Sequence, residues 1–345
     1  MSKGRAACIR NSTMIISCHC FSRRNFQYPA ACGWDFLLQL DISDMNTKKV
    51  ILITGGTGLL GKGMEETMPE NCDIISIHLH PCKMNDSNVK HLVLDIRDKS
   101  AVEQLFIKYR FDAVIHAAGI ASVDYVKNNY AESLESNIVG TLNISSMCRK
   151  GGAYLIYISS NAVFDGLSAP YDETSKPNPV NEYGEIKLEC ERLIEKTIPD
   201  ACIIRPILMY GWNHLACRTN PVTWLIEKLK TGQKVNVVDD VWENPLYNQQ
   251  CGEAIWKAIE MRPGGKVHLA GADVLNRFQL ALLTAEVFGL DRGLITAVKS
   301  TCFPDLAPRP PNTSFSTHKM QELLGVKPVS VRAGLEDMHM REVIV

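Results

Sequence analysis

Tyr183 and Lys187 are the residues whose types and spacing suggest proton-transfer chemistry. They lie in NEYGEIKLECERLIEK (181–196), which has helical periodicity and ends just before Pro199, a residue that disfavours helix at the preceding position. The two side chains are therefore expected one helical turn apart on the same face. A lysine charge favours the phenolate form of a nearby tyrosine, which could then exchange a proton. Such pairs also occur by chance on exposed helices, so this spacing alone leaves a structural role open.

A second chemical feature is Ser160 in the segment YISSNAVFDG (157–166). Strand-forming residues at 153–158 precede two serines, which fall where a strand would leave its sheet. In open α/β sheets, ligands bind outside the carboxyl ends of the strands. We therefore expect Ser160 to face a ligand.

A glycine-rich turn supplies a third feature, in KVILITGGTGLLGKG (49–63). A buried strand at 50–54 is followed by Gly55, Gly58 and Gly61 at three-residue spacing, and then by a helix-compatible run to Met68. Glycines let backbone approach a pyrophosphate, and the helix N-terminus stabilises its charge. This order of elements predicts nucleotide binding, although a purely structural turn could also hold glycines.

The elements that must position these residues follow a repeating pattern. Short apolar segments, mostly separated by helix-length stretches such as 99–110 and 131–150, predict a parallel sheet with helices on both faces. The predicted strands after the first are 72–79, 91–98, 111–119, 153–160 and 201–207. The fold class is therefore α/β, a doubly wound parallel sheet, and the 345-residue length leaves room for a smaller second lobe.

The composition is that of an ordinary globular protein. A net charge of −1 gives no basic excess, so we expect no nucleic-acid partner. No apolar run approaches the roughly 20 residues that a membrane span needs, so we expect no membrane partner. The 12 cysteines are mostly scattered singly, which favours reduced thiols in a cytoplasmic setting. The CHC triplet at 18–20 has no second Cys/His pair at finger spacing, so no metal site is expected.

Residues 1–44 differ in kind from the rest of the chain. They are basic, have no acidic residue before Asp35, and lack a periodic pattern. An organellar transit peptide would have such a composition. We favour a disordered extension or a non-native one with the working start at Met45, because MNTKKVILITGG resembles the start of a domain. The expected location is therefore cytoplasmic.

Together, these features resemble the extended short-chain dehydrogenase/reductase superfamily, also called the NAD-dependent epimerase/dehydratase superfamily, over residues 48–340. The matching motifs are TGGTGLLG for the glycine turn, DIRD and HAAG for the adenine and central-strand motifs, SNIVGTLNI for the helix-four asparagine, and YGEIK for the catalytic signature. The resemblance implies a Rossmann domain over 45–206 with a returning strand near 235–239. Residues 207–345 would mainly form a substrate-binding lobe, built by 207–233 and 250–340.

The resemblance also implies roles for individual residues. Ser160 would hold the substrate oxygen, Tyr183 would exchange its proton, and Lys187 would hold the nicotinamide ribose, while the cofactor carries the hydride. The implied cofactor-binding residues are Gly55, Thr57, Gly58, Leu59, Leu60, Gly61, Lys62, His78, Asp95, Ile96, Ala117, Ala118, Gly119, Asn137, Tyr183, Lys187 and Pro206. The implied substrate-binding residues are Ser160, Asn161, Ala162 and Arg309.

The segment after the second strand bears on the choice of cofactor. An acid there would bind the adenosine 2′-hydroxyl of NAD, but IHLHPCKMND offers His78, His80 and Lys83 before any acid. With Lys62 after the last glycine, this favours NADP(H) over NAD(H). The alternative is that both histidines are merely surface residues. Asp95 is expected at the adenine.

Four segments narrow the resemblance: YISSNAVFDGLSAPYDETSKPNPVNEYGEIKLECE, IIRPILMYGW (203–212), ENPLYNQQCGEAIWKAIE (243–260) and LAPRPPNTSFSTHKMQELLG (306–325). In these, the chain looks most like the dTDP-4-dehydrorhamnose reductase group and its relative, the methionine adenosyltransferase beta subunit. The implied function is NADP(H)-dependent reduction of a nucleotide-activated 4-keto-6-deoxy sugar. Arg309 would anchor the substrate diphosphate, or would be a structural loop arginine. Asn161-Ala162 replaces the Asp-Tyr of rhamnose reductases and lacks the acid pair of dehydratases, so the sugar could differ and dehydration is disfavoured.

Two alternatives remain open, an epimerase of the same fold and a regulatory subunit that binds NADP(H) with little turnover. Helices corresponding to 131–150 and 181–197 pair two subunits in many relatives, so we expect a homodimer.

Overall fold

The computed structural model describes residues 48–81, 89–214 and 218–342. The expected extension at 1–44, the CHC triplet and Lys83 lie outside the described residues.

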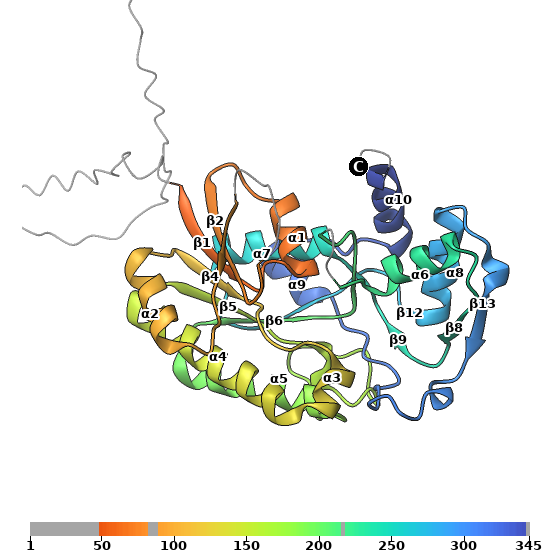
Figure 1. Cartoon of the computed structure of the whole chain (residues 1–345), viewed down its shortest axis with the longest axis horizontal. Coiled ribbons are helices and arrows are strands. Elements are labelled where there is room, and N and C mark those ends of the chain that lie inside the picture. Colours follow the sequence, from red (N-terminus) through yellow and green to blue (C-terminus); the bar gives the residue numbers. More distant parts are fainter. Residues whose placement is uncertain (1–47, 82–88, 215–217, 343–345) are drawn as a thin grey trace, which may run out of the picture. The chain divides into compact units, whose positions relative to one another are not determined.

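A parallel sheet forms the centre of the described chain (Figure 1). Its seven strands run in the order β11-β6-β5-β4-β1-β2-β3, and every neighbouring pair is parallel. The strands are β1 (Lys49–Thr54), β2 (Cys72–His78), β3 (Val89–Val93), β4 (Ala113–His116), β5 (Tyr154–Ile158), β6 (Cys202–Pro206) and β11 (Gly265–Leu269). The order reverses between β1 and β4, and this switch point is where doubly wound folds bind ligands. The predicted doubly wound fold is confirmed.

Helices cover both faces of the sheet (Figure 1). Ile51 and Ile53 of β1 pack into one core, beneath α1, α7 and α9, while Leu52 points to the opposite core, beneath α2, α4 and α5. This alternation follows the two-residue period of a strand, and both faces are apolar because both are covered. The helices are α1 (Leu59–Glu66), α2 (Lys99–Lys108), α3 (Val123–Asn128), α4 (Tyr130–Gly151), α5 (Glu182–Thr197), α7 (Asn248–Met261) and α9 (His318–Leu324).

A smaller lobe is built from the remaining elements, around its own apolar clusters. Its helices are α6 (Pro221–Lys230), α8 (Arg277–Val287) and α10 (Val331–Glu342). Its short strand pairs are β7 (Met209–Tyr210) with β10 (Leu246–Tyr247), β8 (Val235–Val238) with β13 (Ile295–Val298), and β9 (Trp242–Glu243) with β12 (Leu275–Asn276).

The predicted returning strand near 235–239 exists as β8, but its placement in the main sheet was wrong. It pairs with β13, and Val235 is buried against Leu225, Leu229 and Ile295 of the small lobe. The seventh strand of the main sheet is β11, which follows α7 and pairs with β6. Consequently α7, β11 and α9, which we expected in the substrate lobe, belong with the main sheet in the large lobe.

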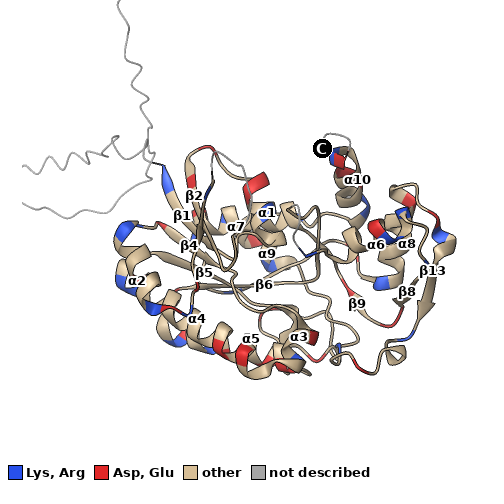
Figure 2. Cartoon of the chain, viewed as in Figure 1, with Lys and Arg blue, Asp and Glu red and all other residues tan. Residues whose placement is uncertain are grey.

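The surface charges of the described chain are mixed in sign. In the view of Figure 2, basic and acidic residues are interspersed along α2, α4 and α5. None of the described helices is long and apolar enough to cross a membrane. Within residues 48–81, 89–214 and 218–342, no group of three or more His, Cys, Asp or Glu side chains could hold a metal ion.

Candidate active site

The glycine turn joins β1 to α1 and requires residues without a side chain. Gly55 has a φ of +74°, and a Cβ there would lie 2.9 Å from the Ala118 backbone. A Cβ on Gly61 would lie 1.9 Å from the Gly56 carbonyl oxygen. Gly58 precedes the first residue of α1, so the helix N-terminus begins at this turn. This arrangement leaves room for a pyrophosphate and offers it amide donors. The residues present therefore fit a dinucleotide.

A buried network holds the ends of β1 and β4 together beside the turn. Nδ1 of His116 lies 2.8 Å from the Thr54 hydroxyl, and its Nε2 lies 3.0 Å from the Thr141 hydroxyl. The Thr54 oxygen accepts hydrogen bonds from the amides of Ala117 and Ala118. Burial and the charge of Lys187 lower the pKa of His116 to about 3, so the ring is neutral at pH 7. Our sequence analysis missed this histidine as a support of the site.

Helix α5 brings the predicted catalytic pair to the carboxyl end of β5. It begins after Asn181, whose side chain accepts a hydrogen bond of 2.9 Å from the Gly184 amide. A Cβ on Gly184 would lie 2.1 Å from the Ala162 carbonyl oxygen, so only glycine allows this approach of α5 to the serine-containing loop. Tyr183 therefore lies on the helix turn that contacts the segment after Ser160.

Tyr183, Lys187 and Ser160 line one cleft, the candidate catalytic cleft, together with the glycine turn. The Lys187 amino group is buried and donates a 3.0 Å hydrogen bond to the Ile158 carbonyl, and it lies 6.0 Å from the centre of the Tyr183 ring. The Ser160 hydroxyl accepts a 3.1 Å hydrogen bond from the Ala162 amide. The structure thus brings the three predicted catalytic residues together.

The cleft has a volume of about 590 Å³. Part of its lining consists of residues that were not predicted from the sequence. Chief among them are Arg218, Glu243 and Arg277. They come from the segment before α6, from β9 and from the first position of α8, far apart in the sequence. No local motif surrounds them, so no sequence signal could have grouped them.

The predicted substrate-binding residues face the same cleft but already have protein partners. The Asn161 amide donates to the Thr313 hydroxyl at 2.7 Å and to Glu243 at 3.3 Å. Arg309 pairs with Asp124 at 2.8 Å and donates to the Ala307 carbonyl. Ala162 also lines the cleft.

A second cleft, of about 960 Å³, extends from the glycine turn past the ends of β2 and β3. Among the predicted cofactor-binding residues, it is lined by Gly55, Thr57, Gly58, His78, Asp95, Ile96, Ala117, Ala118 and Gly119. Arg97, which our sequence analysis missed, also lines it and forms two close contacts with Asp95, of 2.6 and 2.9 Å. Hydrogen bonds from Arg97 lower the pKa of Asp95, so this carboxylate is charged and engaged.

Of the other predicted cofactor-binding residues, Leu59, Leu60 and Pro206 line the catalytic cleft, whereas three residues line neither cleft. Gly61 packs against Gly56, and Lys62 forms an ion pair of 3.0 Å with Glu66. Asn137 is buried and donates to the Ser133 carbonyl.

A third cavity, of about 590 Å³, lies in the small lobe and shares Val241, Arg277 and Arg309 with the catalytic cleft. Its remaining lining is largely apolar and includes Trp224, Leu280 and Phe303.

Comparisons with known proteins agree with this architecture. Residues 48–343 match the model of the RmlD substrate binding domain family. The chain belongs to this family. The resemblance to the extended short-chain dehydrogenase/reductase superfamily is thereby confirmed.

Individual relatives fall into two kinds. The chain is 28% identical over 298 residues to methionine adenosyltransferase 2 subunit beta of Xenopus tropicalis, covering 84% of this chain and 86% of the relative. It is 29% identical over 242 residues to dTDP-4-dehydrorhamnose reductase of Mycobacterium tuberculosis, covering 68% and 77%. A solved dTDP-4-dehydrorhamnose reductase from Bacillus anthracis in complex with NADP is 26% identical, with a TM-score of 0.74 and coverage of 86% and 100%.

Proposed function

We propose that this protein is an NADP(H)-dependent reductase of a nucleotide-activated 4-keto-6-deoxy sugar. The observation that carries the proposal is that Ser160, Tyr183 and Lys187 line one cleft with the glycine turn. The cofactor, when bound, supplies the hydride. The residues of this chain bind the sugar ketone and deliver the proton that its oxygen must gain.

Each catalytic side chain has a defined task in this proposal. Ser160 donates a hydrogen bond to the ketone oxygen, and Tyr183 transfers its phenolic proton to that oxygen as the carbon accepts hydride. Lys187 stabilises the phenolate, and its amino group is held in place by the Ile158 carbonyl. Solvent then returns a proton to Tyr183.

The small lobe supports a nucleoside diphosphate as the carrier of the sugar. Arg218, Arg277 and Arg309 line the catalytic cleft, and guanidinium groups bind phosphate oxygens in pairs. The neighbouring apolar cavity shares Arg277 and Arg309 and contains Trp224, which suits a nucleobase. A ligand that spans the catalytic cleft and the apolar cavity would place its sugar next to Tyr183.

The second cleft, which extends past the ends of β2 and β3, is the proposed adenosine cleft. Its lining supports NADP(H) over NAD(H) as the cofactor. At the end of β2 the described residues are His78, Leu79, His80 and Pro81, with no carboxylate, and Asp95 is neutralised by Arg97. Lys62, which we expected to bind the 2′-phosphate, pairs with Glu66 and does not line this cleft, whereas Arg97, His78 and His80 do. We therefore assign that contact to Arg97 and the histidines.

NADPH and NADH oxidation, measured with a panel of dTDP- and GDP-4-keto-6-deoxy sugars, tests the proposal. We expect turnover with at least one sugar, a preference for NADPH, and loss of about 100-fold or more in kcat for Tyr183→Phe. Tyr130→Phe, which changes an exposed tyrosine on α4, should behave as the wild type. Turnover that survives Tyr183→Phe would contradict the assignment.

The regulatory-subunit alternative is favoured by the similarity to the beta subunit of methionine adenosyltransferase 2. NADPH binding without turnover on any sugar, together with stoichiometric co-elution with a methionine adenosyltransferase catalytic subunit, would support it. An epimerase would instead interconvert sugar nucleotides without net NADPH consumption. The homodimer through α4 and α5 and the cytoplasmic location stay predictions, which light scattering and cell fractionation would test.

A further inference from the structure

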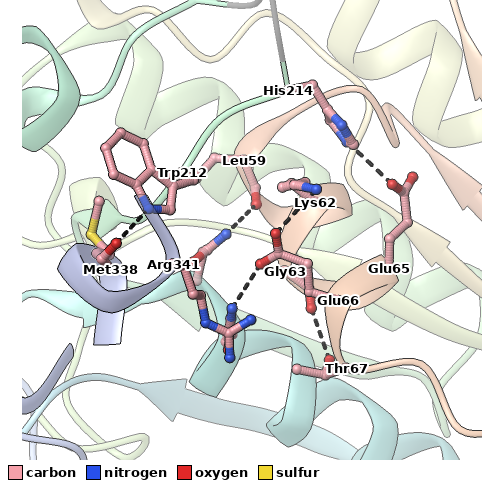
Figure 3. A network of polar contacts seen from close by, with 12 residues as sticks. Leu59, Lys62, Gly63, Glu65, Glu66, Thr67, Trp212, His214, Met338 and Arg341 are labelled. Carbon is pink, nitrogen blue, oxygen red and sulfur yellow. Dashed lines mark hydrogen bonds and ion pairs between the residues drawn. The ribbon is translucent and has the colours of Figure 1, made fainter. Parts of the chain in front are cut away.

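His214 reaches from the segment after β7 to helix α1, which carries the glycine turn (Figure 3). Its Nε2 lies 3.4 Å from a carboxylate oxygen of Glu65, and the two side chains are only 9% and 5% exposed. His214 lines the adenosine cleft beside Gly55 and Thr57. A residue next to the small lobe thus lies beside the turn expected to hold the pyrophosphate.

The backbone near His214 is anchored on its other side as well. The indole of Trp212 donates a 2.8 Å hydrogen bond to the Met338 carbonyl on α10 (Figure 3). Helix α1 receives further contacts from α7, because Asn248 donates to the Leu59 carbonyl and Gln249 donates to Glu66. Residues 212–214 therefore connect α10 to α1.

The protonation state of His214 suits a hydrogen-bonding role. Burial, and then the positive charge of Lys62, lower its pKa to about 4, so the imidazole is neutral at pH 7. Its contact with Glu65 is then a polar contact rather than an ion pair. A neutral ring at this edge of the cleft can form a hydrogen bond without adding charge next to a pyrophosphate.

We infer that His214 is a cofactor-positioning residue, which lines the cleft beside the glycine turn and contacts helix α1 through Glu65. The inference rests on the proposed NADP(H) site. It extends that site to a residue outside the nucleotide-binding motifs. Asn213, its neighbour, lines the catalytic cleft and accepts a 2.7 Å hydrogen bond from Asn220. The cofactor turn and the wall of the catalytic cleft are therefore connected through consecutive residues.

The test is a fluorescence titration of the full chain with NADPH, comparing the wild type with His214→Ala. We expect the Kd to rise about tenfold, which corresponds to about 1.4 kcal/mol. His318→Ala is the matched control, because that side chain is 76% exposed on α9, and its Kd should be unchanged. If His214→Ala leaves the Kd unchanged, the inference is wrong.

A second ligand separates positioning from general loosening of the fold. Adenosine 2′-monophosphate lacks the pyrophosphate, so its affinity should be the same in His214→Ala and in the wild type. Equal weakening of both ligands would overturn the inference in favour of a structural role. If the alanine variant does not fold, His214→Phe carries the test, because it keeps an aromatic ring but cannot form the hydrogen bonds, so its NADPH Kd should also rise about tenfold and an unchanged Kd would overturn the inference.

The outcome is independent of turnover. A wild type that binds NADPH but reduces no sugar would contradict the proposed reductase activity, while the His214 effect on the Kd would still stand. A reductase with normal activity and normal NADPH affinity in His214→Ala would contradict only the inference.

Discussion

Two arginine–glutamate pairs lie near the proposed catalytic residues. They differ in their exposure to solvent and in the residues that they contact. Arg205 of β6 and Glu191 of α5 are 0% and 1% exposed and make two hydrogen bonds, of 2.8 and 2.6 Å. Arg277 and Glu243 of the small lobe are 27% and 8% exposed, with one contact of 2.9 Å. The first pair lies inside the large lobe, whereas the second lines the catalytic cleft.

The contacts of each pair explain this difference. Glu191 lies one turn after Lys187 and two turns after Tyr183, and it accepts a 2.5 Å hydrogen bond from Ser159, the neighbour of Ser160. The buried pair therefore aligns α5 with the loop that contains Ser160. Glu243 instead contacts Asn161, and Arg277 faces both the cleft and the apolar cavity. The partial exposure of this second pair is consistent with the phosphate contact that we propose for Arg277.

The largest effect should follow from breaking the buried pair. Glu191→Ala leaves the guanidinium of Arg205 buried without its carboxylate, so we expect the free energy of unfolding to fall by about 3–5 kcal/mol. Urea denaturation followed by circular dichroism measures this. The double variant Glu191→Leu with Arg205→Met should recover most of the loss, and a double variant as unstable as the single one would contradict the explanation.

An intermediate effect should come from pH, through a histidine beside the buried pair. His268 is fully buried, and its Nε2 lies 3.3 Å from Arg205. Burial and the Arg205 charge lower its pKa from 6.5 to about 3. The unfolded chain therefore binds a proton below pH 6.5 that the folded chain excludes, and stability is lost as pH falls from 6.5 towards 3.

Between pH 7 and pH 5, His268 should contribute a loss of about 2 kcal/mol in the free energy of unfolding. The measurement is urea denaturation at both pH values for the wild type and His268→Gln. The variant should lose about 2 kcal/mol less than the wild type. His318→Gln, at an exposed position, should not change the pH dependence.

The smallest effect on stability should come from the pair in the cleft. Arg277→Ala should change the free energy of unfolding by less than about 1 kcal/mol, because the guanidinium is partly solvated. The same change should raise the KM for the sugar nucleotide about tenfold with little change in kcat, because a phosphate contact is lost. If Arg277→Ala and Glu191→Ala lowered the free energy of unfolding by equal amounts, the distinction between the two pairs would be contradicted.

The residues found from the sequence belong to continuous local patterns. Gly55, Ser160 and Tyr183 each lie within a strand, turn or helix whose order along the chain determines their meeting at one sheet edge. Glu243, Arg277 and His214 could not be predicted, because the chain brings them back from other elements and no spacing links them. The wrong prediction for strand β8 shows the same limit. A mostly apolar strand of four residues does not reveal from its sequence whether β6 or β13 is its partner.

The measurement that tests the central claim most directly is transfer of deuterium from [4-²H]NADPH to a 4-keto-6-deoxy sugar nucleotide, followed by mass spectrometry of the product. The proposed reductase predicts one deuterium on the sugar carbon with the wild type, and labelling that is about 100-fold slower or more with Tyr183→Phe. Bound NADPH with no labelled sugar from any of the dTDP- or GDP-linked substrates would contradict it.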